Sequence, residues 1–301
     1  MGLVLFASCE EPIHFDIDDQ ARLVIYSNFS NQQTLEVYVS KTRSVFSTDP
    51  TEFVEDATVM VFQGNDLLEI LQPVPFDPVL QMPPHYKTLQ MQPQIGVVYT
   101  IKVTAPGFEP VTATNSIPHA VPIESVDFST ASQNVVNESK TVKFDVSVTF
   151  HDPADEVNYY HLVFHQRIHP YVIDAQGDTI ISELTLHTPL DVNLADPDAP
   201  ATRYFDGRSF LIKDQFFNGE KISFPFNGSF SYNPVEFLPG EFIIELRSVS
   251  EAYYLYHVTI SRQFNTDNPF AEGVVVYDNV ENGEGIFAGY SSSFNSFKSS
   301  N

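Results

Sequence analysis

The strictest alternation of apolar and polar residues in the chain is Val142-Lys143-Phe144-Asp145-Val146-Ser147-Val148-Thr149-Phe150. Alternation with a period of two is typical of a β-strand that buries one face and exposes the other. The stretch therefore predicts a half-buried strand in a β-rich domain, and it is followed at once by the breaking sequence His151-Asp152-Pro153.

Segments on both sides of this stretch carry the same kind of signal. Runs of β-branched and aromatic residues occupy 23–26, 35–39, 57–62, 96–103, 158–164, 179–181 and 242–246. Turn-forming residues separate them, with a hairpin turn expected at 63–66, a turn at 176–178, a Pro-rich loop over 73–93 and an Asp/Pro-rich loop over 191–200. The chain is therefore predicted to be mainly β.

One helix is expected within this β pattern, over 251–264. Ser250 is a suitable N-cap, and an acidic residue follows it in the first turn. Tyr253, His257, Ile260 and Phe264 recur at helical spacing and predict its buried stripe.

The chain is predicted to form two β-sandwich domains, the second with the embedded helix. Residues 117–123 contain Pro118 and Pro122, which stiffen the backbone and disfavour a helix, so the domain boundary is placed there. The domains are expected at 21–118 and 123–290, and a Ser/Asn-rich tail at 291–301 is expected to be loose.

Composition limits the classes of partner. The chain has 301 residues, 26 Phe and 14 Tyr, and its formal net charge is −24. Such an acidic protein repels nucleic acid and anionic lipid surfaces, so both are unsuitable partners. The tightest acidic clusters, Asp16/Asp18/Asp19 and Asp196/Asp198, lack the spacing of an EF-hand loop and are interpreted as solubilising charge.

The only cysteine, Cys9, follows the apolar run Gly2-Leu3-Val4-Leu5-Phe6-Ala7-Ser8. Small residues before a cysteine, after an apolar run, are typical of the end of a bacterial lipoprotein signal. Residues 1–8 are then a residual signal sequence, and residues 9–20 are an acidic tether whose acyl chains on Cys9 hold the protein to a lipid bilayer. The alternative is a small buried thiol in an ordinary strand.

Motifs that would carry chemistry are weak. Gly283-x-Gly285-x-x-x-Gly289 lacks the strand, helix and βαβ context of a nucleotide loop, so it favours a twisted terminal strand. His161, His165 and His169 would share one face of a helix, but their segment alternates like a strand. No catalytic residue, cofactor or metal ligand is assigned, although paired carboxylates of a glycosidase remain open because folding alone would bring them together.

Two tyrosine-rich stretches, Asn158-Tyr159-Tyr160 and Tyr253-Tyr254-Leu255-Tyr256, are dense in residues that dominate binding surfaces. Tyrosine also packs well in β-sandwich cores. Core or interdomain packing is the role expected for most of them.

The chain resembles a Bacteroidetes family of outer-membrane lipoproteins known only as domain of unknown function 4249. The residues that carry the resemblance, in chain order, are Val98-Tyr99-Thr100-Ile101, Pro106-Gly107-Phe108, Ile117-Pro118, Asp152-Pro153, Asn158-Tyr159-Tyr160, Asp214-Gln215, Phe217-Asn218-Gly219, Leu246, Ser248-Val249-Ser250, Tyr253, Asn268-Pro269-Phe270-Ala271-Glu272, Asn279-Val280-Glu281-Asn282-Gly283 and Gly285-Ile286-Phe287. The chain departs from the family pattern at Gly273, where proline is usual, and at Glu284, where Leu is common.

The resemblance implies an immunoglobulin- or transthyretin-like first domain and a lipoprotein encoded beside a TonB-dependent receptor. It implies no known enzyme activity. Glu10-Glu11 after Cys9 resembles a surface-export signal of that phylum, and a generic polar linker is the equal alternative.

The function expected from the sequence is an outer-membrane, lipid-anchored protein at the cell surface. It would act as an accessory or ligand-capture module of a TonB-dependent transporter, with that receptor as its partner. The alternatives are a hydrolase of a surface polymer and a structural subunit of an envelope assembly machine.

Lipidation at Cys9 is directly testable. Once a full-length signal is restored, metabolic labelling with a fatty-acid analogue should mark the wild-type protein and leave Cys9→Ser unlabelled. Label that persists in Cys9→Ser would show that the lipid, if any, is carried elsewhere.

Overall fold

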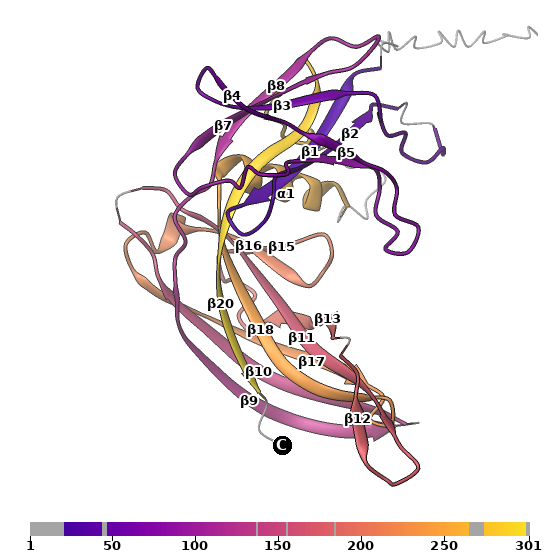
Figure 1. Ribbon diagram of the computed structural model, residues 1–301. Coiled ribbons are helices and arrows are strands. Elements are labelled where there is room, and N and C mark those ends of the chain that lie inside the picture. The colour runs from indigo at the N-terminus through magenta and orange to yellow at the C-terminus, as the bar shows by residue number, and fades with distance from the viewer. Residues whose placement is uncertain are drawn as a thin grey trace, which may run out of the picture.

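A computed structural model describes residues 21–43, 47–136, 138–154, 156–183, 185–264 and 274–298 of the chain (Figure 1). Strands account for 58% of the structure and helices for 6%. The prediction of a mainly β fold with several sheets and one substantial helix is therefore confirmed.

The described residues form three sheets. The five-stranded sheet has the order β19-β8-β7-β3-β4. Its strands are β3 (Thr58–Gln63), β4 (Asp66–Ile70), β7 (Val98–Thr104), β8 (Val111–Ser116) and β19 (Val280–Glu281). The four-stranded sheet has the order β14-β17-β10-β9. Its strands are β9 (Ile123–Val136), β10 (Ser139–His151), β14 (Asp191–Leu194) and β17 (Lys221–Tyr232).

The third sheet has eleven strands and runs through the whole molecule. Its main order is β15-β16-β11-β18-β20-β1-β2-β6-β5, and β12 and β13 also pair with β11. Its strands are β1 (Leu23–Ser30), β2 (Glu36–Lys41), β5 (Gln72–Val74), β6 (His85–Lys87), β11 (Tyr159–Ile173), β12 (Thr179–Ile181), β13 (Leu186–Pro189), β15 (Ala201–Arg203), β16 (Ser209–Lys213), β18 (Phe237–Val249) and β20 (Glu284–Lys298). The helical segments within the described ranges are η1 (Asp214–Phe216), a 3₁₀ turn, and α1 (Glu251–Phe264).

The first unit packs the five-stranded sheet against β1, β2 and the start of β20. Its core contains Ile25, Val61 and Ile101 from three different strands, together with Phe287 of β20. The ring of Phe29 stacks on that of Phe287 with centroids 4.4 Å apart. A strand near the C-terminus therefore completes the core of the N-terminal unit.

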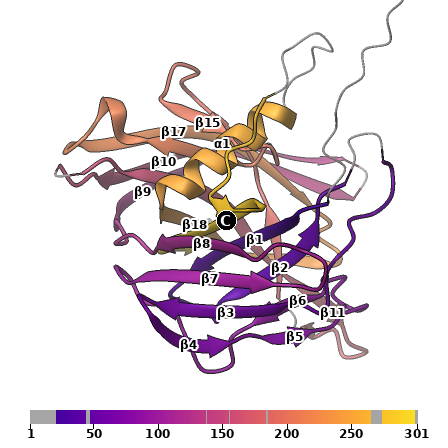
Figure 2. The same ribbon diagram turned by 90° about the horizontal axis from the view of Figure 1, so that it is seen from above.

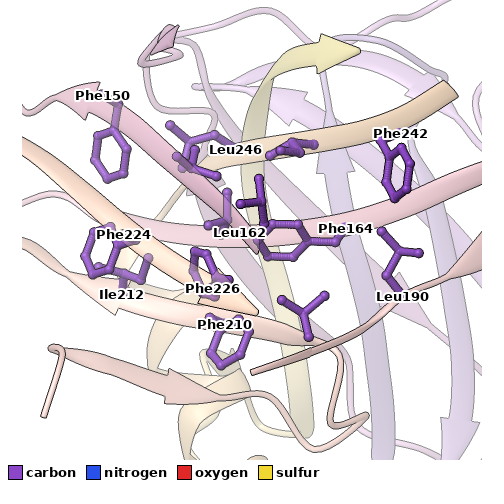
Figure 3. Close-up of a cluster of buried hydrophobic side chains, with 14 of the residues drawn as sticks. Phe150, Leu162, Phe164, Leu190, Phe210, Ile212, Phe224, Phe226, Phe242 and Leu246 are labelled. Atoms are coloured by element: carbon purple, nitrogen blue, oxygen red, sulfur yellow. The ribbon is translucent and has the colours of Figure 1, made fainter. Parts of the chain in front are cut away.

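The second unit packs the four-stranded sheet against β11, β16 and β18. The strand expected from the opening alternation is β10, and its buried apolar residues are Val142, Phe144, Val146, Val148 and Phe150. Side chains from both layers converge there, and Figure 3 shows Phe150, Leu162, Phe164, Phe210, Phe224, Phe226 and Phe242 within one apolar layer.

The two units share the long strand β20, which Figure 1 shows passing from the upper unit into the lower one. Residues 284–290 pair in parallel with β1, and residues 290–298 pair antiparallel with β18. The separation into domains 21–118 and 123–290 is therefore incomplete, because β19 and the first half of β20 return to the first unit. The tail that was expected to be loose over 291–301 is part of β20 as far as Lys298, and Phe297 packs on Phe242 of the second core.

The glycines of β20 explain why this strand fits between the units. Gly285 has φ +110°, and a Cβ there would overlap with the carbonyl of Ile25 on β1. A Cβ on Gly289 would overlap with the carbonyl oxygen of Ser116 at the end of β8. The glycine pattern therefore serves close backbone approach in a terminal strand, which the sequence favoured over a nucleotide loop.

The connector 117–123 is packed at both ends. Ile117 is buried in the first core, and the backbone N–H of Val121 donates to Ser248 Oγ of β18 at 2.9 Å. Ser291 Oγ of β20 donates to the carbonyl of Pro118 at 2.8 Å. The connector is therefore fixed against the shared sheet as well as stiffened by its prolines.

Helix α1 covers the face of the large sheet opposite to both smaller sheets, and Figure 2 shows it alongside β8 and β1. Ile286 and Ala288 of β20 face the helix, whereas Phe287 faces the first core. The helix boundaries 251–264 agree with the prediction, and Tyr253 N donates to Ser250 Oγ at 3.3 Å.

The predicted buried stripe of α1 is only half right. Tyr253 and His257 are buried, but Ile260 is half-buried and Phe264 is exposed. The residues that face the sheet are Ala252, Tyr253, His257, Val258 and Ser261. In the last turns of the helix, the buried positions are therefore Val258 and Ser261 rather than Ile260 and Phe264. An argument from apolar periodicity misses a buried serine.

Two predicted loops contain strands. The Pro-rich loop 73–93 includes the end of β5 and all of β6, which pair with each other, and β6 also pairs with β2. The loop 191–200 begins with β14, whose Val192 is buried against β17. Tertiary pairing formed these short strands where the local residues favoured turns.

Substitution of Gly289 tests the role of β20 as a shared strand. Gly289→Ala is expected to lower the free energy of unfolding by about 2–3 kcal/mol, because the backbone of Ser116 leaves no room for a methyl group. Urea unfolding measures this change. Gly107→Ala, at an open turn with φ +81°, is the control and should cost only about 1 kcal/mol from backbone strain.

Hydrogen exchange gives the decisive readout for this variant. Amides of both β1 and β18 should exchange faster in Gly289→Ala, because each pairs with β20. Loss of protection in β1 alone, with β18 unchanged, would show that the strand does not couple the two units.

Candidate functional site

The predicted lipidation site Cys9 and the whole tether 9–20 lie outside the described residues, which begin at Ala21. Among the described residues, no helix is both long and apolar enough to cross a bilayer. The described part of the chain holds three other regions of interest: a buried polar network under α1, a groove between the units and an exposed apolar end.

The polar network is centred on His161 of β11. Its Nδ1 lies 2.9 Å from the hydroxyl of Tyr253 on α1, and its Nε2 lies 2.9 Å from Ser209 Oγ on β16. Ser209 Oγ also lies 3.3 Å from Asp206 Oδ1 in the preceding turn. One imidazole therefore links a helix to two strands of the large sheet.

Arg247 of β18 continues the network. Its Nη2 donates to Glu245 Oε2 at 2.8 Å, and Ser292 Oγ of β20 donates to Glu245 Oε1 at 2.6 Å. The guanidinium lies over the ring of Tyr290, 4.9 Å from its centroid. Burial raises the pKa of Glu245, but the hydrogen bond and charge of Arg247 outweigh it, so this pKa lies below its usual value.

His257 connects α1 to the first unit. Its Nε2 lies 3.0 Å from Asn28 Nδ2 on β1, and its Nδ1 lies 3.1 Å from the hydroxyl of Tyr204. Asn28 Nδ2 also donates to the hydroxyl of Tyr26 at 2.9 Å. Through these contacts the helix is hydrogen-bonded to β1 of the first unit and to the turn after β15 in the second unit.

The role of this network is structural rather than catalytic. Burial lowers the pKa of His257 to about 3 and that of His161 well below its usual value, so both rings stay neutral. Ser209 lies beside His161 as a nucleophile would, but its side chain is 1% exposed and no substrate reaches it. The arrangement fixes α1 on the sheet, and it leaves the prediction of no catalytic residue untested.

The histidine series 161, 165 and 169 lies in β11, so the strand interpretation of this segment was correct. His161 enters the buried network, whereas His165 is half-buried near His187, with ring centroids 6.4 Å apart. Within the described ranges, no group of three or more His, Cys, Asp or Glu residues is placed to hold a metal ion.

A groove of about 390 Å³ lies at the junction of the two units. Its walls include Glu156, Tyr159 and Glu251, and Tyr159 donates its hydroxyl to Glu251 Oε1 at 2.8 Å. A second groove of about 330 Å³ shares Ser116, Ser250 and Glu251 with it. Both grooves are open and polar, and the first of them holds the carboxylates of Glu156 and Glu251.

The exposed apolar end lies in the second unit, farthest from the junction, and we call it the distal patch. It consists of Val135, Val136, Val172, Ile173, Ile180, Ile181 and Val235. Each of these side chains is between 52% and 66% exposed. Single exposed aliphatic residues are ordinary on protein surfaces, whereas seven at one end of a molecule are unusual.

Backbone pairing brings these residues together. Val172 pairs with Ile180 in the β11–β12 hairpin, and Tyr171 N donates to Glu236 O at 3.0 Å, beside Val235. The turn that contains Val235 directly follows β17. β17 pairs with β10, and β10 pairs with β9, which carries Val135. Three chain reversals therefore meet at the distal patch, and Figure 1 shows β12 at the lower end of the molecule.

The distal patch was not anticipated from the sequence. The turn at 176–178 and the run 179–181 were predicted, but the residues singled out as typical of binding surfaces were tyrosines. The tyrosine stretches instead pack inside, since Tyr159, Tyr160 and Tyr253 are buried, in agreement with the packing role expected for most of them. The sequence did contain a signal for this patch: two consecutive aliphatic residues stand close to a turn at 135–136, 172–173 and 180–181.

The fold and its surfaces define a mainly β protein in which two packed sandwich units share one strand. The chain belongs to the family described as Domain of unknown function (DUF4249), whose model matches residues 10–295. This confirms the family resemblance.

Comparison with curated proteins gives no match. A solved structure described as "Biofilm associated protein - B domain" is similar at 7% identity and a TM-score of 0.19, covering 91% of this chain and 85% of the other.

The neutral state of the buried histidines predicts the pH dependence of stability. The unfolded chain binds a proton on each histidine near pH 6.5, whereas His161 and His257 stay neutral in the fold. The free energy of unfolding should therefore be highest above pH 6.5 and fall as the pH drops toward 3. Each buried histidine should contribute a loss of about 2 kcal/mol between pH 7.5 and 5.

Urea unfolding at both pH values checks this expectation. His165, whose pKa burial also lowers, should add a smaller part. His257→Gln should reduce the pH-dependent loss by about 2 kcal/mol. An equal pH dependence in the wild type and in His257→Gln would contradict the assignment.

Proposed function

We propose that this protein is a membrane-tethered binding module that serves as an accessory or ligand-capture subunit of a TonB-dependent outer-membrane transporter. The observation that carries the proposal is the distal patch, an exposed apolar surface at the opposite end of the molecule from the start of the described chain (Figure 1). Surfaces of this kind mark protein–protein interaction sites.

The shape of the molecule supports this role. Ala21 precedes β1 in the first unit, whereas the distal patch closes the far end of the second unit. The 13 residues of β10 alone span about 40 Å between the junction and the patch. Because β20 belongs to both units, the molecule acts as a spacer with its tethered end and its apolar end far apart.

The proposed tether makes a weak interaction sufficient. Residues 9–20 would reach at most about 40 Å when extended. A lipid on Cys9 would confine the molecule to the membrane plane, where a membrane-embedded partner meets it at high effective concentration. An outer-membrane β-barrel is the partner that this arrangement favours.

Affinity purification of the tagged, lipidated protein from gently solubilised membranes tests the proposal. Wild type should recover one dominant outer-membrane β-barrel, and the triple variant Val172→Thr/Ile180→Thr/Ile181→Thr should lose it. Threonine keeps the β-branched shape while removing apolar surface. Val98→Thr, at a 53% exposed position in the first unit, is the matched control and should retain the barrel.

Two results would count against this function. Recovery of monomer only, with a purified protein that cleaves or binds a surface polymer alone, would favour a hydrolase or free-standing binder. Recovery of a fixed set of several envelope proteins would favour a structural subunit of an assembly machine.

The junction groove is the specific observation in favour of a hydrolase, because it holds Glu156 and Glu251 together. Polymer cleavage that is lost in Glu251→Gln and kept in the exposed Glu109→Gln would support that alternative. Equal activity, or none, in the wild type and Glu251→Gln would count against it.

A further inference from the structure

Among the strands of the described residues, β12 at the distal patch pairs with β11 alone, so its other edge carries no strand. Asp174 N donates to the carbonyl of Asp178 at 3.0 Å, and Ser182 N donates to the carbonyl of Pro170 at 2.8 Å. In an antiparallel pair, hydrogen-bonded residues alternate along each strand. The backbone groups of Ile180 therefore face β11, and those of Thr179 and Ile181 face outward.

The side chains along this edge are suited to an added strand. Thr179, Ile180 and Ile181 are all β-branched and exposed, and all of β12 is exposed. Exposed edges of this composition invite pairing with another chain, and proteins ordinarily protect them with lysine, proline or a bulge. β12 contains neither lysine nor proline, and the one proline of the hairpin, Pro170, lies on β11. The sequence of β12 therefore lacks this protection.

The charged residues of the β11–β12 hairpin itself are all negative. Asp178 directly precedes β12, Glu183 follows it closely, and Asp174 lies across the turn. No lysine or arginine occurs between Ile168 and Leu186. Acidic groups at both ends of an apolar strand favour a ligand with the opposite arrangement.

We propose that the free edge of β12 binds an extended segment of a partner protein as an added strand. The segment would carry aliphatic residues at its centre, to contact the distal patch, and lysine or arginine residues at both ends. This inference rests on the proposed function only in taking the occupant to be a protein. Backbone hydrogen bonds to Thr179 and Ile181 would supply affinity, and the flanking charges would fix the register.

The charge of the chain separates this occupant from the others. A second copy would bring the same acidic residues against Asp178 and Glu183, and an anionic lipid surface would be repelled in the same way. A basic-flanked segment alone gains from both the apolar and the charged parts of the edge.

The test uses the whole purified protein and a labelled peptide, Lys-Lys-Val-Thr-Val-Thr-Val-Lys-Lys, with a Glu-flanked peptide of the same centre as its control. Fluorescence anisotropy should show the Lys-flanked peptide binding at least about tenfold more tightly, with an affinity that falls as salt is added. Asp178→Asn/Glu183→Gln should remove most of this preference. Glu109→Gln, in a first-unit turn, should leave it unchanged.

A pair of variants at one position separates the backbone edge from the side chain. Ile181→Pro removes an outward N–H without removing a bond to β11, and it should weaken binding about tenfold or more. Ile181→Val keeps the N–H and should bind within about threefold of wild type. Hydrogen exchange of the β11 amides checks that the hairpin survives in both variants.

The outcomes for this inference and for the proposed function are distinct. Equal binding of the two peptides, or wild-type binding by Ile181→Pro with an intact hairpin, would overturn the added-strand proposal even if the barrel is still recovered through the distal patch. Binding to phosphatidylglycerol vesicles instead of peptide, or self-association that Ile181→Pro abolishes, would overturn it too. Peptide binding without recovery of a barrel would leave this inference standing and count against the transporter role.

Discussion

The close approach of backbones along β20 is the constraint on which the rest of the structure depends. Gly285 and Gly289 leave no side chain between β20 and the backbones of Ile25 and Ser116. The strand therefore lies deep enough to pair with β1 at one end and with β18 at the other. Because one strand serves both sheets, the first unit lacks part of its core until the C-terminal segment of the chain has folded onto it.

Helix α1 depends on this shared sheet. Its footprint includes residues of β20, β11 and β18, and its buried side chains are polar as well as apolar. The buried hydrogen bonds of His161 and His257 favour one placement of the helix, because a shifted helix would leave both imidazoles unpaired in a region without water access. The network that resembles a site of chemistry is better explained as the means by which the helix is held across the junction.

The surface and the core of the protein use different kinds of apolar residue. Aromatic residues, which usually dominate binding sites, are used here for packing between layers, whereas small branched aliphatic residues are left exposed at the distal patch. An exposed patch carries a cost in solubility, and the net charge of −24 offsets that cost. The acidic residues beside β12 keep identical copies apart and leave the edge open to an occupant of opposite charge.

The sequence by itself determined the strand class of the fold, the position and capping of α1, and the structural nature of the β20 glycines. These features follow from local periodicity and backbone geometry, which depend only on residues close together in the sequence. Only the tertiary structure decided that 291–298 is a strand, that β20 joins both units, and that Val172 and Ile180 pair and stay exposed, as Val135 does. The Ser-rich segment has no apolar period of its own, and it becomes a strand because β18 offers it hydrogen bonds along one edge. Pairing between residues that are distant in sequence obeys no local pattern, so the shared strand and the distal patch appear only when the chain has folded.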